Sequence, residues 1–173
     1  NLALVGKLPV AGLHLDLVRG QLDIEALNEH WPQDRTISFG LVDGRNIWKT
    51  DLGKALGLAR HAVSWWKPEN VQIAPSCSLL HCPVDLDAET RLDNELKSWV
   101  AFAKQKLAEV KLLAEAAAGR ENEAALEENE QARENRRSSK RIHDSAVKER
   151  LRAVTLAMSR RQHPFIARIE KQQ

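Results

Sequence analysis

The sequence predicts an α/β protein in which short parallel strands alternate with amphipathic helices. Three observations predict this class: short apolar runs bounded by turn residues, segments of helical spacing between the runs, and polar residues directly after each run. The apolar runs lie at residues 10–18, 36–42 and 71–74. Because each connection is long enough to hold a helix, we expect β-α-β-α-β units with a parallel sheet.

The first unit begins with a strand at residues 10–18, an apolar run that contains His14 and Asp16. Residues 21–30 follow with the spacing of a short amphipathic helix. Pro32 ends that helix, since proline lacks the amide donor and its ring clashes with the preceding turn.

The second unit begins with the strand at residues 36–42, which runs directly into the polar turn 43–46. Asp51 is a good N-cap for a helix that we expect to end near Ser64, because its side chain can accept from an unpaired amide of the first turn. The third strand, residues 71–74, leads into a loop that carries both cysteines.

Three strands alone would leave two open apolar edges, and an eight-stranded barrel removes such edges. We therefore expect a partial (β/α)8 barrel made of about the last three βα units, with the missing strands upstream of Asn1. The chain begins with Asn rather than Met, and residues 1–8 read as the end of a helix. Both observations favour a piece of a longer protein.

The character of the chain changes after Asp87, where a single long helix is predicted from about Glu89. Its apolar positions recur at helical spacing: Leu92, Leu96, Trp99, Val100, Ala103, Leu107, Val110 and Leu113. Gly119 ends it. Residues 120–141 are rich in charge and predict a solvated helix or a mobile arm. A last helix is expected around residues 151–157.

Composition excludes several classes of protein. Lys and Arg number 26 against 24 Asp and Glu, so the charge gives no reason to expect nucleic acid or an anionic membrane as the main partner. No apolar run approaches the ~20 residues that span a bilayer, and no signal sequence opens the chain. A soluble, cytoplasmic protein is expected, without a structural disulfide framework.

Cys77, His81 and Cys82 carry the side chains that zinc prefers, which makes them candidate metal ligands. All three lie within six residues, however, and no separated second pair completes a four-ligand site. The spacing therefore favours packing or loop hydrogen bonding, and we assign no metal-ligating residue.

Polar side chains gather where the predicted strands end, and in a barrel this is the face that binds ligands. They are Asp16, Arg19, Asp43, Arg45, Asn46, Ser76 and His81. The alternative is a turn in which Asp43 and Arg45 pair with each other or with a neighbouring loop. Because no acid, base and nucleophile trio is visible, a structural network is favoured, and no catalytic or cofactor-binding residue is assigned.

Two further groups of side chains are candidates for binding. The tryptophans at 31, 48, 65, 66 and 99 are scattered over loops and helices, which favours core and interface packing over ligand stacking. The basic residues Arg133, Arg136, Arg137, Lys140 and Arg141 lie among Glu127, Glu128, Glu130 and Glu134. That mixture predicts a solvated face linked by salt bridges.

Several segments in order resemble the N-terminal domain of cobalamin-independent methionine synthase, 5-methyltetrahydropteroyltriglutamate–homocysteine methyltransferase. They are Leu8-Pro-Val-Ala-Gly-Leu-His-Leu-Asp-Leu-Val-Arg19, Asp43-Gly-Arg-Asn-Ile-Trp48, Ala74-Pro-Ser-Cys-Ser-Leu-Leu-His81, Pro83-Val-Asp-Leu86 and Lys97-Ser-Trp-Val-Ala-Phe102. Their order and spacing match over nearly the whole chain, which makes the set far more specific than any one segment.

The resemblance implies a two-barrel enzyme. Zinc, held by His, Cys, Glu and Cys of the C-terminal barrel, activates homocysteine as a thiolate, and the methyl group comes directly from the polyglutamylated folate. The resemblance places neither the zinc ligands nor the folate-tail contacts in this chain. Residues 76–78 resemble the strand end that carries a zinc cysteine in the other barrel, so Cys77 is interpreted as a relic or a packing residue.

The resemblance also implies a domain organisation. Residues 1–118 would be the C-terminal portion of the N-terminal barrel, and residues 119–173 a charged helical extension towards the second barrel. The chain alone is expected to be inactive, with the missing half-barrel and the catalytic barrel as its partners. The alternative hypothesis is a non-catalytic interaction module or an inactive remnant. A lone zinc enzyme is a weaker third hypothesis.

Overall fold

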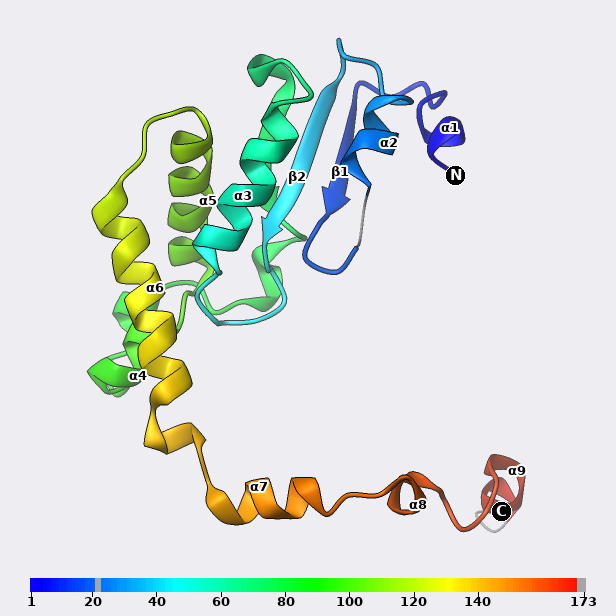
Figure 1. Cartoon of the computed structure of the whole chain (residues 1–173), viewed down its shortest axis with the longest axis vertical. Coiled ribbons are helices and arrows are strands. Elements are labelled where there is room, and N and C mark those ends of the chain that lie inside the picture. The colour runs from blue at the N-terminus through cyan, green and yellow to red at the C-terminus, as the bar shows by residue number, and fades with distance from the viewer. Residues whose placement is uncertain (21–22, 171–173) are drawn as a thin grey trace. The chain divides into compact units, whose positions relative to one another are not determined.

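The structure, a computed structural model, describes residues 1–20 and 23–170, and it contains a three-stranded parallel sheet (Figure 1). Strand β1 (Gly12–Asp16) pairs with β2 (Thr36–Val42), and β2 pairs with β3 (Val71–Pro75). The predicted α/β class, with parallel strands alternating with helices, is confirmed. Within the described part of the chain this sheet is open, with β1 and β3 as its edges. The closed barrel therefore stays a prediction.

Strand β2 is the buried centre of the sheet. Every residue from Ile37 to Val42 is buried, which explains why the run lacks the alternation typical of a half-exposed strand. Gly40 lies where the neighbouring chain approaches closely, since a Cβ there would be 2.6 Å from Cα of Ser76. The close approach brings the segments after β2 and β3 together.

Strand β1 is shorter than the predicted run of residues 10–18. It ends at Asp16 because the Asp16 carboxylate accepts hydrogen bonds from the amides of Val18 and Arg19, each at 3.0 Å. Those amides are thereby turned away from the strand ladder. The local turn, rather than the apolar pattern, determines where this strand ends.

The first two helices are short. Helix α1 (Leu2–Val5) is a single turn. Helix α2 (Ile24–Asn28) has Asp23 as its N-cap, and the Asp23 side chain accepts from the amide of Ala26 at 3.0 Å. The predicted helix at 21–30 is thus present within its described part, while residues 21 and 22 lie outside the described residues.

Helix α3 (Leu52–Val63) has the predicted boundaries. Asp51 is its N-cap and accepts from the amide of Lys54 at 2.9 Å, and Ser64 is its C-cap. One face is buried against the sheet and against α5, the helix at Ala103–Ala117 (Figure 1). The buried side chains recur at helical spacing: Leu52, Ala55, Leu56, Ala59 and Ala62.

The single long helix predicted from Glu89 is wrong. The structure has two helices, α4 (Asn94–Trp99) and α5, separated by an extended segment at residues 100–102. The amide of Ala101 donates to the carbonyl of Ile47 at 2.7 Å, and the amide of Lys49 donates to the carbonyl of Trp99 at 3.0 Å. This antiparallel pairing takes the backbone groups that a continuous helix would need.

The buried face of α5 also differs from the predicted one. The apolar spacing pointed to Leu107 and Val110, yet Leu107 is 55% exposed and Val110 is only partly buried. Leu113 is buried as its spacing predicts, and it is joined on the inner face by Lys106, Glu109 and Ala116. Two charged side chains therefore lie on the inner face of this helix.

Helix α6 (Glu123–Ser138) confirms that the charged stretch is helical, but one face of it is buried rather than solvated. Asn129 and Ala132 are buried, and Oδ1 of Asn129 lies 3.5 Å from the amide of Leu52 at the start of α3. Arg133 forms an ion pair with Asp51. These contacts attach α6 to the N-terminal end of α3.

The chain divides into two compact units, Asn1–Arg136 and Arg137–Gln173. The second unit contains α7 (Ser145–Arg152), α8 (Leu156–Ser159) and α9 (Phe165–Ile169). Short 3-10 turns complete the structure at Pro68–Asn70, Leu79–His81, Leu86–Ala88 and Lys140–Ile142. None of the described helices is long and apolar enough to cross a bilayer.

The contacts of Asp51 generate a stability prediction. Asp51→Ala removes both the cap of α3 and the partner of Arg133, so we expect a loss of about 1–2 kcal/mol in the free energy of unfolding. Asp51→Asn keeps a capping oxygen and loses only the charge, so its cost is expected to be under about 1 kcal/mol. Urea unfolding of both variants measures the difference. Equal losses in the two variants would mean that the cap contributes nothing.

Candidate functional site

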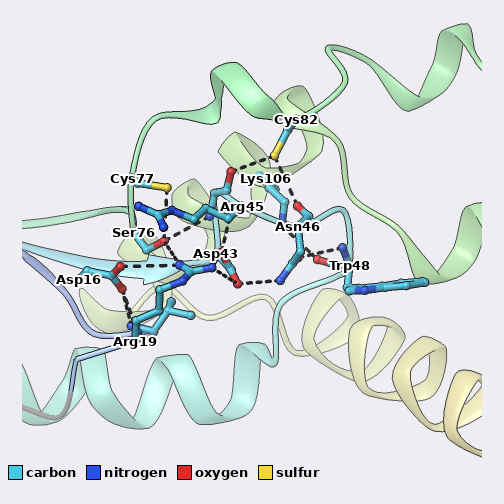
Figure 2. Close-up of polar contacts among 12 residues, drawn as sticks. Asp16, Arg19, Asp43, Arg45, Asn46, Trp48, Ser76, Cys77, Cys82 and Lys106 are labelled. Atoms are coloured by element: carbon cyan, nitrogen blue, oxygen red, sulfur yellow. Dashed lines mark hydrogen bonds and ion pairs between the residues drawn. The ribbon is translucent and has the colours of Figure 1, made fainter. Parts of the chain in front are cut away.

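The predicted polar residues meet at the carboxyl edge of the sheet (Figure 2). Asp16 is the last residue of β1, Asp43 directly follows β2, and Ser76 directly follows β3. Parallel strands place these ends at one edge, which is why three segments far apart in the sequence come together. We call Asp16, Arg19, Asp43 and Ser76 the strand-end cluster.

Arg19 is the link between the three strand ends. Its Nη2 donates to Oδ1 and Oδ2 of Asp43 at 2.8 and 3.1 Å. Its Nη1 lies 3.6 Å from Oδ2 of Asp16 and 3.4 Å from Oγ of Ser76. The hydrogen bond to Asp43 is the main reason that the pKa of Arg19 is raised.

Asp43 is the most heavily hydrogen-bonded carboxylate of this edge. Besides Arg19, it accepts from the amide of Arg45 at 2.8 Å and from Nδ2 of Asn46 at 2.7 Å. Burial alone raises the pKa of Asp43, but the Arg45 amide and the Arg19 guanidinium outweigh it, so the pKa lies below its ordinary value. Asp43 is therefore ionised and held in place at neutral pH.

The turn after β2 is packed tightly against the loop after β3. The amide of Gly44 lies 3.3 Å from the buried hydroxyl of Ser76. A Cβ at Gly44 would lie 2.8 Å from the carbonyl oxygen and 2.9 Å from Sγ of Cys77, so only glycine fits without displacement. The Cys82 thiol donates to the carbonyls of Gly44 and Asn46 at 3.2 and 3.4 Å.

His14 adds a second connection between the strands. Its Nδ1 lies 2.9 Å from Oγ of Ser38 on β2, and its Nε2 lies 3.3 Å from the carbonyl of Ser76. Both ring nitrogens thus have partners from neighbouring strands, which leaves neither directed at an open site.

The buried charges of α5 extend this network and were not found from the sequence. Nζ of Lys106, which is fully buried, donates to the carbonyl of Trp48 at 3.1 Å. Burial lowers the pKa of Lys106, while the charges of Glu109, Cys82 and Asp43 act against that shift. An apolar-spacing argument could not find a lysine on an inner face.

Glu109 holds the same loop from the next turn of α5. Its carboxylate accepts from the amide and the hydroxyl of Thr50 at 3.0 and 2.7 Å. Burial raises the pKa of Glu109, and the two bonds from Thr50 act in the opposite direction. Lys106 and Glu109 together anchor residues 48–50 to α5.

Cys77, His81 and Cys82 lie close together in the sequence, but the structure separates their surroundings. Among the described residues no group of three or more His, Cys, Asp or Glu side chains is arranged to hold a metal ion. The Cys82 thiol is buried and bonded to carbonyls, whereas Cys77 and His81 line an open hollow together with Arg45 and Ser78. A guanidinium at the rim disfavours a cation, so these residues do not fit zinc.

The tryptophans behave largely as predicted. Trp31, Trp66 and Trp99 are 1–3% exposed and belong to the core. Trp48 and Trp65 are half-buried, and the guanidinium of Arg136 lies 3.6 Å from the ring centroid of Trp48. Trp48 is thus covered by a side chain of α6 instead of presenting a stacking surface.

The arrangement organises loops, and it contains no nucleophile activated by a neighbouring base. The carboxylates and guanidinium of the strand-end cluster are paired with one another. Asp43 is paired to Arg19 of the neighbouring loop and to the Arg45 amide, which is the pairing expected of a structural network; the absence of catalytic residues stays a prediction. His81 does not join the cluster and lies on the exposed loop beside it.

Comparison with known proteins gives the class. Residues 1–65 match the family model described as "Cobalamin-independent synthase, N-terminal domain". An α/β unit with parallel strands and a polar carboxyl edge agrees with that class. The resemblance seen in the sequence is confirmed: the chain is homologous to the N-terminal domain of cobalamin-independent methionine synthases.

Individual related proteins give a more specific comparison than the family model. The chain is 47% identical over 174 residues to a 5-methyltetrahydropteroyltriglutamate–homocysteine methyltransferase of Xylella fastidiosa (strain M23). It is 47% identical over 181 residues to the protein of that name from Nitratidesulfovibrio vulgaris. These alignments cover 100% and 99% of this chain but 23% of each relative. The chain thus spans about a quarter of the length of these curated relatives.

The different burial of the two thiols generates a reactivity prediction. Cys77 is partly exposed at the hollow, while Cys82 is 7% exposed beneath the turn after β2. In the folded chain we expect Cys77 to react with a disulfide reagent at least about tenfold faster than Cys82. Cys77→Ser should remove the fast phase and Cys82→Ser should keep it. Equal rates for both thiols would contradict the described packing.

The buried lysine generates a pH prediction. Because the pKa of Lys106 is lowered in the folded state, the unfolded chain binds more protons as the pH approaches the ordinary lysine value of 10.5. The stability of the natural chain relative to Lys106→Met should therefore rise with pH in that window. Urea unfolding at several pH values measures it.

Lys104→Met is the matched control for this measurement. Lys104 is exposed and hydrogen-bonded to Asp85 and Asp87, and its pKa is raised, so removal of its charge should give no such rise. A flat difference for Lys106→Met would mean that Lys106 is solvated.

Proposed function

We propose that the chain is a structural part of the N-terminal barrel of an enzyme that makes methionine. The parent enzyme transfers a methyl group from 5-methyltetrahydropteroyltri-L-glutamate to L-homocysteine. The observation that carries the proposal is 47% identity over the whole chain to proteins that bear the name of this reaction. The chain by itself is catalytically inactive.

The open sheet supports a place within a larger barrel. Strand β2 is buried on both faces, whereas β1 and β3 are the edges of a three-stranded sheet. Parallel sheets with apolar edges are stable when further strands cover those edges, and a (β/α)8 barrel supplies them. We propose that residues 1–118 form about three βα units of this barrel and that residues 119–173 lead towards the second barrel.

The geometry of the strand ends supports a scaffolding role. A group that binds substrate needs polar atoms left open to the ligand, whereas Arg19, Asp43 and Ser76 are bonded to one another. In the parent enzyme, zinc supplies the thiolate form of homocysteine at neutral pH. Its ligands lie outside this chain in the proposal, since Cys77, His81 and Cys82 do not fit the metal. This edge of the barrel positions loops that support the folate side of the reaction.

The reading frame around this segment tests the proposal. We expect an upstream half-barrel and a downstream barrel with a His, Cys, Glu and Cys zinc set, in one continuous frame. The purified 173-residue chain supplied with zinc and both substrates should form no methionine, and the polypeptide of the complete frame should form it.

Stop codons at both ends, together with a monodisperse chain that unfolds cooperatively, would contradict the proposal. Those results would favour an interaction module or an inactive remnant, in which the three βα units act as a platform. Methionine formation by the isolated chain would refute the scaffolding role directly.

A further inference from the structure

The unit Arg137–Gln173 exposes an unusually large share of its apolar side chains. None of its described residues is buried. Nine large apolar side chains are at least 40% exposed: Ile142, Val147, Leu151, Val154, Leu156, Met158, Phe165, Ile166 and Ile169. We call these nine residues the C-terminal apolar surface. A segment that leaves nine large apolar side chains in water is stabilised when another surface covers them.

Part of this surface is organised by a preformed helix. Asp144 caps α7 by accepting from the amide of Val147 at 3.1 Å. Val147 and Leu151 are four residues apart within α7, so that they lie on one side of this helix, and Val154 follows just beyond its C-cap Ala153. A capped helix with an apolar side offers a partner a contact whose ordering cost is partly met in advance.

The same unit is strongly basic. Residues 137–173 contain ten Lys and Arg against three Asp and Glu, a net charge of +7, whereas residues 1–136 contain sixteen against twenty-one, a net charge of −5. The near-neutral total therefore conceals two oppositely charged parts. A partner for the basic unit needs apolar pockets within an acidic surface.

We propose that the C-terminal apolar surface docks onto an acidic, apolar-grooved face of the second barrel in the longer polypeptide. This inference rests on the proposed function. The curated relatives have about four times the length of this chain. In the proposed longer polypeptide, the second barrel can therefore cover the surface. Docking there makes residues 137–173 a fixed strut between the barrels rather than a free linker.

A protein face explains these features better than a lipid surface. The helices of the unit have eight, four and five residues, too short to lie in a membrane interface as one continuous amphipathic helix. Seven of the nine apolar side chains are branched aliphatic groups, and the aromatic Trp and Tyr that favour the headgroup region are absent from residues 137–173. Branched aliphatic groups at helical spacing suit pockets in a packed protein surface.

Trypsin measures the docking, because Arg150, Arg152, Arg160 and Arg161 lie among the apolar residues. The completed polypeptide is the Xylella fastidiosa (strain M23) methyltransferase in which the 174 aligned residues are replaced by this chain. We expect cleavage at these arginines to be at least about tenfold slower in the completed polypeptide than in the 173-residue chain. Leu151→Asp and Phe165→Asp should abolish that protection.

Gln162→Asp is the matched control, since it adds the same charge at an exposed polar position and should leave the protection intact. If the full replacement does not fold, a replacement of residues 137–173 alone provides the same measurement. Equal cleavage rates in the completed and isolated chains would overturn the docking. Equal protection in the Leu151→Asp and Phe165→Asp variants would overturn the assignment of the surface.

Two further readouts separate the possible failures. Methionine formation by the completed polypeptide reports on the proposed function. An active polypeptide without protection from trypsin would contradict the docking alone. A protected but inactive polypeptide would contradict the proposed function alone. Sedimentation of the 173-residue chain with phosphatidylserine vesicles, without protection in the completed polypeptide, would assign the surface to lipid instead.

Discussion

The carboxyl edge of the sheet depends on the ion pair between the Asp43 carboxylate and Arg19. Asp43 follows the central strand and binds Arg19, which lies beyond β1, while its other bonds fix residues 45 and 46 of its own turn. Arg19 in turn reaches the hydroxyl of Ser76 after β3. The ion pair of Asp43 with Arg19 therefore connects three loops that follow three different strands. Because the pKa of Asp43 is lowered, its carboxylate stays ionised at a lower pH than an ordinary aspartate does.

Two charged side chains of α5, Lys106 and Glu109, are buried near this edge, and their desolvation lowers the stability of the fold. Lys106 and Glu109 are desolvated, and each is held by only a few hydrogen bonds to residues 48–50. Apolar side chains of similar volume could fill the same space at lower cost. The two charged side chains instead fix the geometry of the loop, because the carbonyl of Trp48 and the hydroxyl of Thr50 must lie at defined positions to bond to them. The loop that carries Trp48 is thereby held in one conformation.

The parts of the fold that the sequence predicts well are those governed by neighbours in the chain. The limits of α3 follow from Asp51 and from the spacing of its buried alanines and leucines, and β2 follows from an unbroken apolar run bounded by polar residues. The gathering of polar residues at one edge follows from the parallel order of the strands. The sequence does not predict which group pairs with the Asp43 carboxylate. That pairing depends on distances between loops, which no local pattern contains.

Errors arose where distant segments decide the structure. The helix expected from Glu89 is interrupted because residues 99–101 pair with residues 47–49, about fifty positions earlier in the chain. The inner face of α5 differs from its apolar spacing for the same reason, since Lys106 and Glu109 are buried by partners in that earlier segment. Helical spacing shows which apolar side chains a helix could bury. It does not show which polar groups of distant segments pack against that helix.

The short antiparallel bridge between Trp48 and Val100 has a further consequence for the order of assembly. Closing a loop of this length is entropically costly, and the break between α4 and α5 acquires its hydrogen bonds only when that loop has closed. The break between the two helices therefore depends on a contact made some fifty residues away in the sequence. A change that separates residues 47–49 from residues 99–101 would leave these backbone groups without their partners.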